Sequence, residues 1–250
     1  MLVVLYTVAA LAAVRGMWSP CGMSMLSALN PVAERARGHR FWVTACWYLL
    51  GAAAGGALLG LGCAAGAAAV SALHPGSTLV WLLALAGGLV ATASDMGTGW
   101  SLPDQPRQVD ERWLVRYRRW LYAAGYGVQI GAGFATYIMT AAVYLVALLA
   151  VLTTDPTAAF TAGLVFGVVR GACIGVAGLA RDPDRLRTLL GRIDASAGAS
   201  AAVAGAACAG VAVVAASALG GVAGAGGAAV ALSIFAVACR SRARRASFPL

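Results

Sequence analysis

Long apolar runs alternate with short polar segments along the whole chain of 250 residues. Each run is near or above the ~20 residues that a helix needs to cross ~30 Å of hydrocarbon. The pattern therefore predicts an all-α, polytopic membrane protein that forms a single transmembrane domain over residues 1–250, with about seven transmembrane helices. The runs cover residues 2–30, 41–73, 78–96, 120–152, 157–180, 198–219 and 222–239.

The last two predicted spans are the least distinct, because residues 198–239 form a nearly unbroken run of Ala, Gly and Val. A turn is expected where glycines cluster, around Gly220, Gly221, Gly224 and Gly226. A single helix over this run would be about 63 Å long and would far exceed the bilayer. Two helices are therefore predicted, and six spans in total remain the alternative.

The composition supports lipid as the main surroundings of the chain, since 61% of the residues are hydrophobic and only 11% are charged. All 18 basic residues are arginine, and most lie in the first, third and fifth polar segments and in the tail. Such clusters set membrane orientation and do not form the basic face of a nucleic-acid-binding protein. We expect a plasma (inner) membrane protein with its N-terminus outside and its C-terminus cytoplasmic. The clusters are Arg35–Arg40, Arg107–Arg119, Arg181–Arg192 and Arg240–Arg245.

Several kinds of site are excluded by what the sequence lacks. The six cysteines are scattered without a C-x-x-C pair, so neither a zinc site nor a disulfide scaffold is expected. His39 and His74 are the only histidines, and they lie in polar segments on opposite sides of the predicted bundle, which excludes a bis-histidine haem site. No metalloprotease, serine hydrolase or P-loop motif occurs. We expect no bound metal and no cofactor.

The first apolar run contains an unusual polar break. Ser19, Pro20, Cys21 and Gly22 follow one another where an uninterrupted helix would be expected. Proline removes a backbone donor, and non-helical backbone at membrane depth must face protein or a water-filled cavity. The sequence thus predicts either a substrate site or a kink used only for packing.

The fourth run has a similar break, at Gln129, Gly131 and Gly133. Aligning it with the first run on two pairs of glycines sets Pro20 against Gly131 and Cys21 against Ala132. Because the two spans run in opposite directions, this alignment predicts an inverted three-plus-three repeat with broken first and fourth helices. The first repeat would cover about 1–96, the second about 120–219, and an extra C-terminal helix about 222–239.

Arg15 and Arg170 lie near the middle of two predicted spans, where an arginine costs at least ~2.5 kcal/mol on insertion scales. Such residues usually face a bundle interior or a wet cavity. Arg170 precedes Cys173 by one helical turn, where its charge would favour a thiolate, and it could instead bind an anionic substrate or backbone carbonyls. Asp95, at the end of the third run, is expected at the membrane interface.

The Ser19-Pro20-Cys21-Gly22 segment, taken with the inverted repeat, resembles the CcdA/DsbD membrane thiol carriers, which are associated with cytochrome c biogenesis. This resemblance implies thiol-disulfide exchange in which Cys21 passes electrons from a cytoplasmic thioredoxin-like protein to an extracytoplasmic thiol protein. The family's second cysteine is missing, because Ala132 occupies its place. Cys173 and Cys46 are the substitutes.

Membrane thiol-based electron transfer is therefore the leading functional hypothesis, and the protein would be a thiol-disulfide oxidoreductase if it is an enzyme. A second hypothesis is a transporter of a small anion or a soft metal on the same fold. A third is a non-catalytic membrane subunit that packs through glycine stripes. The clearest stripe consists of Gly163, Gly167, Gly171 and Gly175.

Overall fold

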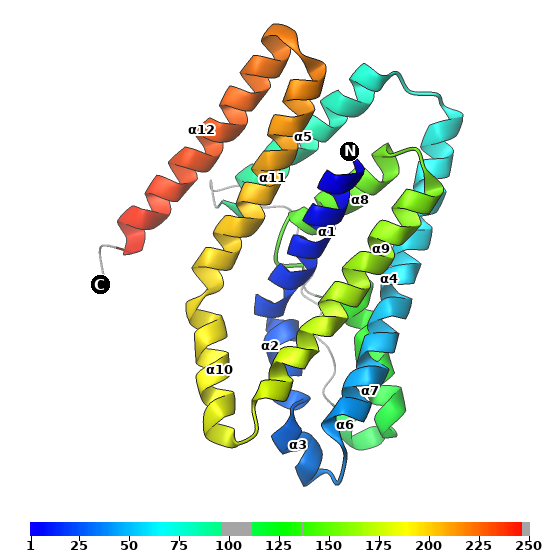
Figure 1. Ribbon diagram of the computed structural model, residues 1–250, viewed down its shortest axis with the longest axis vertical. Coiled ribbons are helices and arrows are strands. Elements are labelled where there is room, and N and C mark those ends of the chain that lie inside the picture. The colour runs from blue at the N-terminus through cyan, green and yellow to red at the C-terminus, as the bar shows by residue number, and fades with distance from the viewer. Residues whose placement is uncertain (97–111, 137, 247–250) are drawn as a thin grey trace.

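The computed structural model describes residues 1–96, 112–136 and 138–246, and this part of the chain folds into helices joined by turns (Figure 1). The predicted loop that contains Arg107 lies partly outside the described residues. The helices are α1 (Leu2–Arg15), α2 (Pro20–Ala28), α3 (Pro31–Ala36), α4 (Phe41–Ala72), α5 (Ser77–Asp95), α6 (Trp113–Arg116), α7 (Arg119–Gly131), α8 (Ala142–Leu152), α9 (Pro156–Ala172), α10 (Pro183–Ala195), α11 (Ala197–Leu219) and α12 (Gly221–Ala246). Two 3₁₀ segments follow α1 and α9, namely η1 (Gly16–Trp18) and η2 (Cys173–Leu179).

Four helical segments are long and apolar enough to cross a membrane, namely α4, α5, α11 and α9 together with η2. The bent pair of α1 and α2 can form a fifth span. The protein therefore has the helix lengths and hydropathy of an integral membrane protein. Seven spans are not reached by this criterion in the described residues. The fourth apolar run is divided between α7 and α8, and the apolar described part of α12 is short.

The long helix α4 packs against α9 and α7 through glycines. On one side, a Cβ added to Gly56 would lie 2.6 Å from the carbonyl oxygen of Gly163 and 2.7 Å from Cα of Gly167. Ordinary van der Waals contacts begin near 3.4 Å, so only glycine permits this approach. Gly62 and Gly175 have nothing within 4 Å of the same position. The close contact therefore involves Gly163 and Gly167 of the predicted stripe but not Gly175, and on α4 it involves Gly56 but not Gly62.

The Ala/Gly/Val run near the C-terminus forms two helices and not one. α11 ends at Leu219, and Gly220 and Gly221 turn the chain with φ values of 65° and 60°. These are left-handed conformations that glycine adopts at little cost. α11 packs on α5, and α12 folds back along the outside of the bundle (Figure 1).

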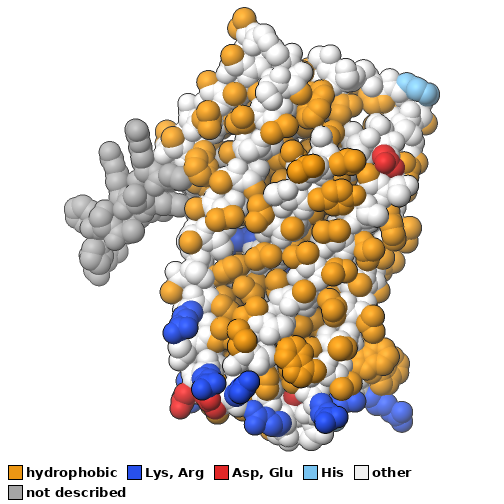
Figure 2. Space-filling model, viewed as in Figure 1, with side chains coloured by type: hydrophobic (Ala, Val, Ile, Leu, Met, Phe, Trp, Pro, Cys, Tyr) orange, Lys and Arg blue, Asp and Glu red, His pale blue; other side chains and the backbone are white. Residues whose placement is uncertain are grey.

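One end of the molecule collects the basic side chains, while apolar side chains cover most of the face in view (Figure 2). At the same end, Glu34 is completely buried. Its carboxylate accepts hydrogen bonds from Arg37 at 2.8 Å, from the hydroxyl of Thr44 and from the hydroxyl of Tyr122. The short helix α3 is thereby tied to α4 and α7.

Candidate functional site

The first apolar segment breaks at Ser19, at the position that the sequence predicts. α1 ends at Arg15, Ser19 adopts an extended conformation, and α2 begins at Pro20, so the two helices meet at an angle of 67°. The hydroxyl of Ser19 donates to the carbonyl of Gly16 at 2.7 Å and accepts from the amide of Gly22 at 3.1 Å. Ser19 therefore caps α2, and proline occupies the first helical turn, where it needs no backbone partner.

Gly22 allows the first turn of α2 to pack directly against the backbone of η1. A Cβ at this position would lie 2.5 Å from the carbonyl oxygen of Gly16 and 2.6 Å from that of Met17. A larger residue would force α2 away from the end of η1. Ser19, Pro20 and Gly22 together thus serve the backbone geometry of a bent helix.

The fourth apolar segment is also interrupted. α7 ends at Gly131, Gly133 has φ of 73°, and α8 begins at Ala142. The start of α8 is held by Asp95, which accepts hydrogen bonds from the hydroxyl of Thr140 and, at 2.6 Å, from the amide of Ala141. A carboxylate at a helix N-terminus is favoured by the helix dipole. Asp95 is therefore a capping residue for a second helix.

Arg170 reaches the first break from the C-terminal turn of α9. Its side chain is buried, with 5% of its surface exposed, and its guanidinium carbon lies 5.7 Å from the centre of the Phe166 ring. A Cβ on Gly16 would come within 2.5 Å of this guanidinium carbon, so the cation lies against bare backbone. Among the described residues, Nε and Nη2 of Arg170 have no hydrogen-bond partner.

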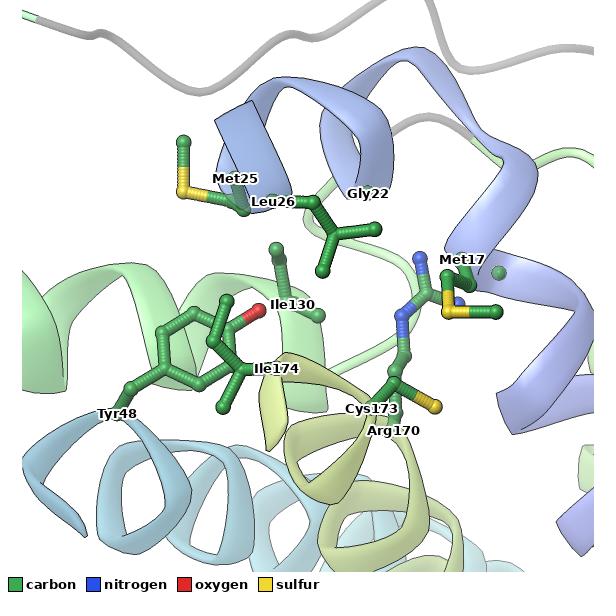
Figure 3. Close-up of a pocket in the computed structure, with 10 residues that line it drawn as sticks. Met17, Gly22, Met25, Leu26, Tyr48, Ile130, Arg170, Cys173 and Ile174 are labelled. Carbon is green, nitrogen blue, oxygen red and sulfur yellow. The ribbon is translucent and has the colours of Figure 1, made fainter. Parts of the chain in front are cut away.

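A small cavity of about 20 Å³ lies beside this guanidinium (Figure 3). Its polar lining comes from Tyr48, Arg170 and Cys173, and the backbone of Gly16 and Gly22 closes one side. The apolar part of the lining consists of Met17, Met25, Leu26, Ile130 and Ile174. The space is sufficient for about one water-sized group. Both broken segments contribute to the lining, since Gly22 comes from the first and Ile130 from the fourth.

The three predicted cysteines do not share one environment. Cys21 is buried at the start of α2, Cys173 is half-buried and lines the cavity, and Cys46 is exposed on α4. The thiol of Cys173 donates to the carbonyl oxygen of Val169 at 3.3 Å. None of the cysteines whose side chains the structure describes forms a disulfide.

The remaining predicted residues lie outside the cavity lining. Arg15 donates to the carbonyl of Ala197 at 3.3 Å and to the hydroxyl of Ser200 at 2.5 Å, which ties α1 to α11. Gly131 packs against the backbone of α4, and a Cβ on Gly133 would lie 3.1 Å from the Phe166 ring. Gln129 is half-buried on α7.

Two buried polar residues are absent from the sequence-based prediction. Tyr48 lines the cavity from α4, and Figure 3 shows its hydroxyl turned toward Ile130. Glu34 forms the buried network described above. Both residues could have been found in the sequence as polar groups within or beside an apolar run. Such a group needs a hydrogen-bond partner when it is buried. In the described residues, no three His, Cys, Asp or Glu side chains gather closely enough to hold a metal ion.

Three proteins similar to this chain are each named methylamine utilization protein MauF. The protein of Paracoccus versutus is 31% identical over 179 residues, which are 70% of this chain and 65% of that protein. The protein of Paracoccus denitrificans is 30% identical over 181 residues, covering 70% and 64%. The protein of Methylorubrum extorquens is 32% identical over 156 residues, covering 61% and 54%. The matched regions thus span less than two thirds of each relative. No protein-family profile and no solved structure matches the chain.

These relatives overturn the resemblance to the CcdA/DsbD thiol carriers, and with it the predictions of thiol-disulfide electron transfer and of a role in cytochrome c biogenesis. The structure supplies the physical reason for the error. Ser19, Pro20 and Gly22 are the residues that a capped, sharply bent helix needs, whatever stands at position 21. The short segment therefore marks a helix break and does not identify a redox pair. The chain is instead similar to proteins that are named methylamine utilization protein MauF.

Proposed function

We propose that this chain acts in methylamine utilization as a non-catalytic, membrane-embedded subunit. The support is the similarity to three proteins that carry this function in their name, together with the apolar helices of the bundle. Glycine contacts between α4 and α9 give the bundle a closely packed interior, which suits a subunit that holds a fixed shape in the bilayer.

The observation that carries the non-catalytic role is the charge of the central cavity. Methylamine is protonated at neutral pH and carries a positive charge. Arg170 places a buried positive charge in the same small space, and like charges at low dielectric repel strongly. The cavity would therefore exclude methylammonium, so this chain acts by supporting other components and not by turning over the amine.

We also propose seven crossings, with the N-terminus outside and the arginine-rich end cytoplasmic. The gathering of basic side chains at one end of the molecule supports this orientation, because arginine is enriched in cytoplasmic segments (Figure 2). The seven crossings would be the bent pair α1 and α2, then α4, α5, the divided pair α7 and α8, α9, α11 and α12. The breaks in the first and fourth crossings support an inverted repeat of residues 1–96 and 120–219.

Deletion of the gene in the organism that carries it tests the proposed role. Growth with methylamine as the only nitrogen source should be lost, and growth with ammonium should be kept. A copy in which Cys21, Cys46 and Cys173 are replaced by serine should restore growth on methylamine, because the proposed role needs no thiol. Unchanged growth of the deletion strain on methylamine would contradict the role.

The non-catalytic part of the proposal has its own test. The purified protein in detergent should bind no radiolabelled methylamine at concentrations that saturate the pathway. Saturable binding that disappears when unlabelled methylamine is added would show that the chain handles the amine directly, and the proposal would then be wrong.

A further inference from the structure

Within the part of the chain that the structure describes, no carboxylate forms a salt bridge with the guanidinium of Arg170. It is 95% buried, and two of its three nitrogens lack a hydrogen-bond partner among the described residues. Buried guanidinium groups are ordinarily paired with carboxylates or with several carbonyl oxygens. The nearest polar lining groups are the Tyr48 hydroxyl and the Cys173 thiol, which are neutral in their protonated forms.

At the break, the guanidinium of Arg170 borders a cavity, and its Nε and Nη2 have no hydrogen-bond partner among the described residues. Figure 3 shows the guanidinium lying between Met17 and the turn of α2 that contains Gly22. The absence of a side chain at Gly16 makes room for it, since a Cβ there would lie 2.5 Å from the guanidinium carbon. The cavity of about 20 Å³ borders the same group.

A second source of positive potential faces the cavity. α2 begins at Pro20, and Gly22 in its first turn belongs to the lining. A helix N-terminus carries about half of a positive charge. The amides of Gly22 and Met23 are bonded to Ser19, so the start of α2 adds positive potential to the cavity and no hydrogen-bond donor of theirs. The C-terminal turn of α9, from which Arg170 projects, contributes an opposite partial charge of about one half. The full charge of Arg170 together with the α2 terminus therefore exceeds this compensation.

We infer that the cavity beside Arg170 binds one small monovalent anion, which contacts the guanidinium of Arg170 beside the N-terminal turn of α2. The anion is a structural ligand that joins the broken first segment to α9. The cavity limits its size to about one water-sized group, so chloride is the best-matched probe, formate tests the upper limit of size, and gluconate is too large. This inference does not depend on the proposed role in methylamine utilization, and an anion that fills the cavity equally leaves no space for methylammonium.

Thermal unfolding of the full chain in detergent tests the inference. The wild-type melting temperature should be higher in sodium chloride or sodium formate than in sodium gluconate of equal ionic strength. The rise should be about 3 °C when the anion is at ten times its dissociation constant. A rise with chloride alone or formate alone would also support the site and would identify the preferred anion. Equal melting temperatures in all three salts would overturn the inference.

Two variants locate the effect at Arg170. Arg170→Met keeps an unbranched apolar stem and removes the guanidinium with its charge, so the difference between chloride and gluconate should vanish. Gly16→Ala keeps the charge but places a methyl group where the guanidinium lies, and it should weaken anion binding at least tenfold. Because the guanidinium is the flexible end of a side chain, this second variant should still fold, and it keeps the test decisive if Arg170→Met does not.

Arg15→Gln is the matched control, because Arg15 is also a buried mid-segment arginine but is bonded to Ala197 and Ser200. It should melt at a lower temperature than the wild type and keep the full shift between chloride and gluconate. If Arg170→Met keeps the shift in melting temperature between chloride and gluconate, the anion does not bind where we infer, whatever Arg15→Gln does.

Discussion

The close contact between α4 and α9 predicts that two glycines of α4, Gly56 and Gly62, differ in how well they tolerate substitution by alanine. Gly56 faces α9, where a Cβ would lie 2.6 Å from the carbonyl oxygen of Gly163, about 0.8 Å short of ordinary contact at 3.4 Å. Gly62 lies on α4 with nothing within 4 Å of its Cβ position. Gly56→Ala should therefore disturb the bundle, whereas Gly62→Ala should not.

The magnitude follows from the nature of the obstacle. The atoms that a Cβ at Gly56 would meet are backbone, so the helices themselves must move apart. A gap of 0.5–1 Å already forfeits a quarter to a half of each dispersion contact that it opens. Overpacking of a core generally costs about 1–3 kcal/mol, which corresponds to a fall in melting temperature of about 2–12 °C for a chain of this length. Gly62→Ala should gain up to about 1 kcal/mol, because alanine favours the helix more than glycine does.

Thermal unfolding in one detergent at one scan rate, followed by tryptophan fluorescence, measures both variants against the wild type. The expected order of melting temperatures places Gly56→Ala lowest and Gly62→Ala at or above the wild type. If the two variants melt together, α4 and α9 do not approach as closely as the structure has them, and the packing argument fails.

Three further predictions concern Glu34, Asp95 and the C-terminal tail. Glu34→Gln should lower the free energy of unfolding by about 1–3 kcal/mol, because it weakens a buried bond network to Arg37 and Tyr122; thermal unfolding checks this. Asp95→Asn should lower the free energy of unfolding by about 1–3 kcal/mol, since it removes the carboxylate that holds the start of α8; thermal unfolding against the wild type would detect it. A C-terminal fluorescent protein should fold and an alkaline phosphatase fusion should be inactive, if the tail is cytoplasmic; an active phosphatase fusion would contradict the proposed orientation.

Much of the helical framework could be predicted from the sequence, because hydrophobic run length is a direct consequence of bilayer thickness. The turn at Gly220 and the break at Ser19 could also be predicted from the sequence, because each depends on residues within the same short segment. Glycine clusters and a capped proline determine backbone geometry within a few residues. A break in the fourth run was also predicted, at Gly131 and Gly133, but the capping of α8 was not, since Asp95 holds the start of α8 from a different helix.

The chemistry of the site was harder to predict than its position. Gly22, Arg170 and Cys173 line one cavity at the first break, whereas the sequence marked each of them separately and did not predict that they lie together. The function assigned to them was wrong because a serine, a proline and a glycine next to a cysteine satisfy two different demands. One demand is thiol chemistry, and the other is a bent helix. The hydrogen bonds of Ser19 show that the second demand is met, and the similarity to the MauF proteins argues against the first.

Arg15 and Arg170 show what sequence alone could not separate. Both are single arginines inside apolar runs, and both have the same insertion cost. The partners of Arg15 are Ala197 and Ser200, which come from a helix far along the chain, so Arg15 is a tether between α1 and α11. Nε and Nη2 of Arg170 have no hydrogen-bond partner in the described part of the chain, and its guanidinium borders a cavity. A charge inside an apolar run therefore points to a binding site only after its long-range partners are known, and by that criterion Arg170 is the candidate for binding and Arg15 is part of the scaffold.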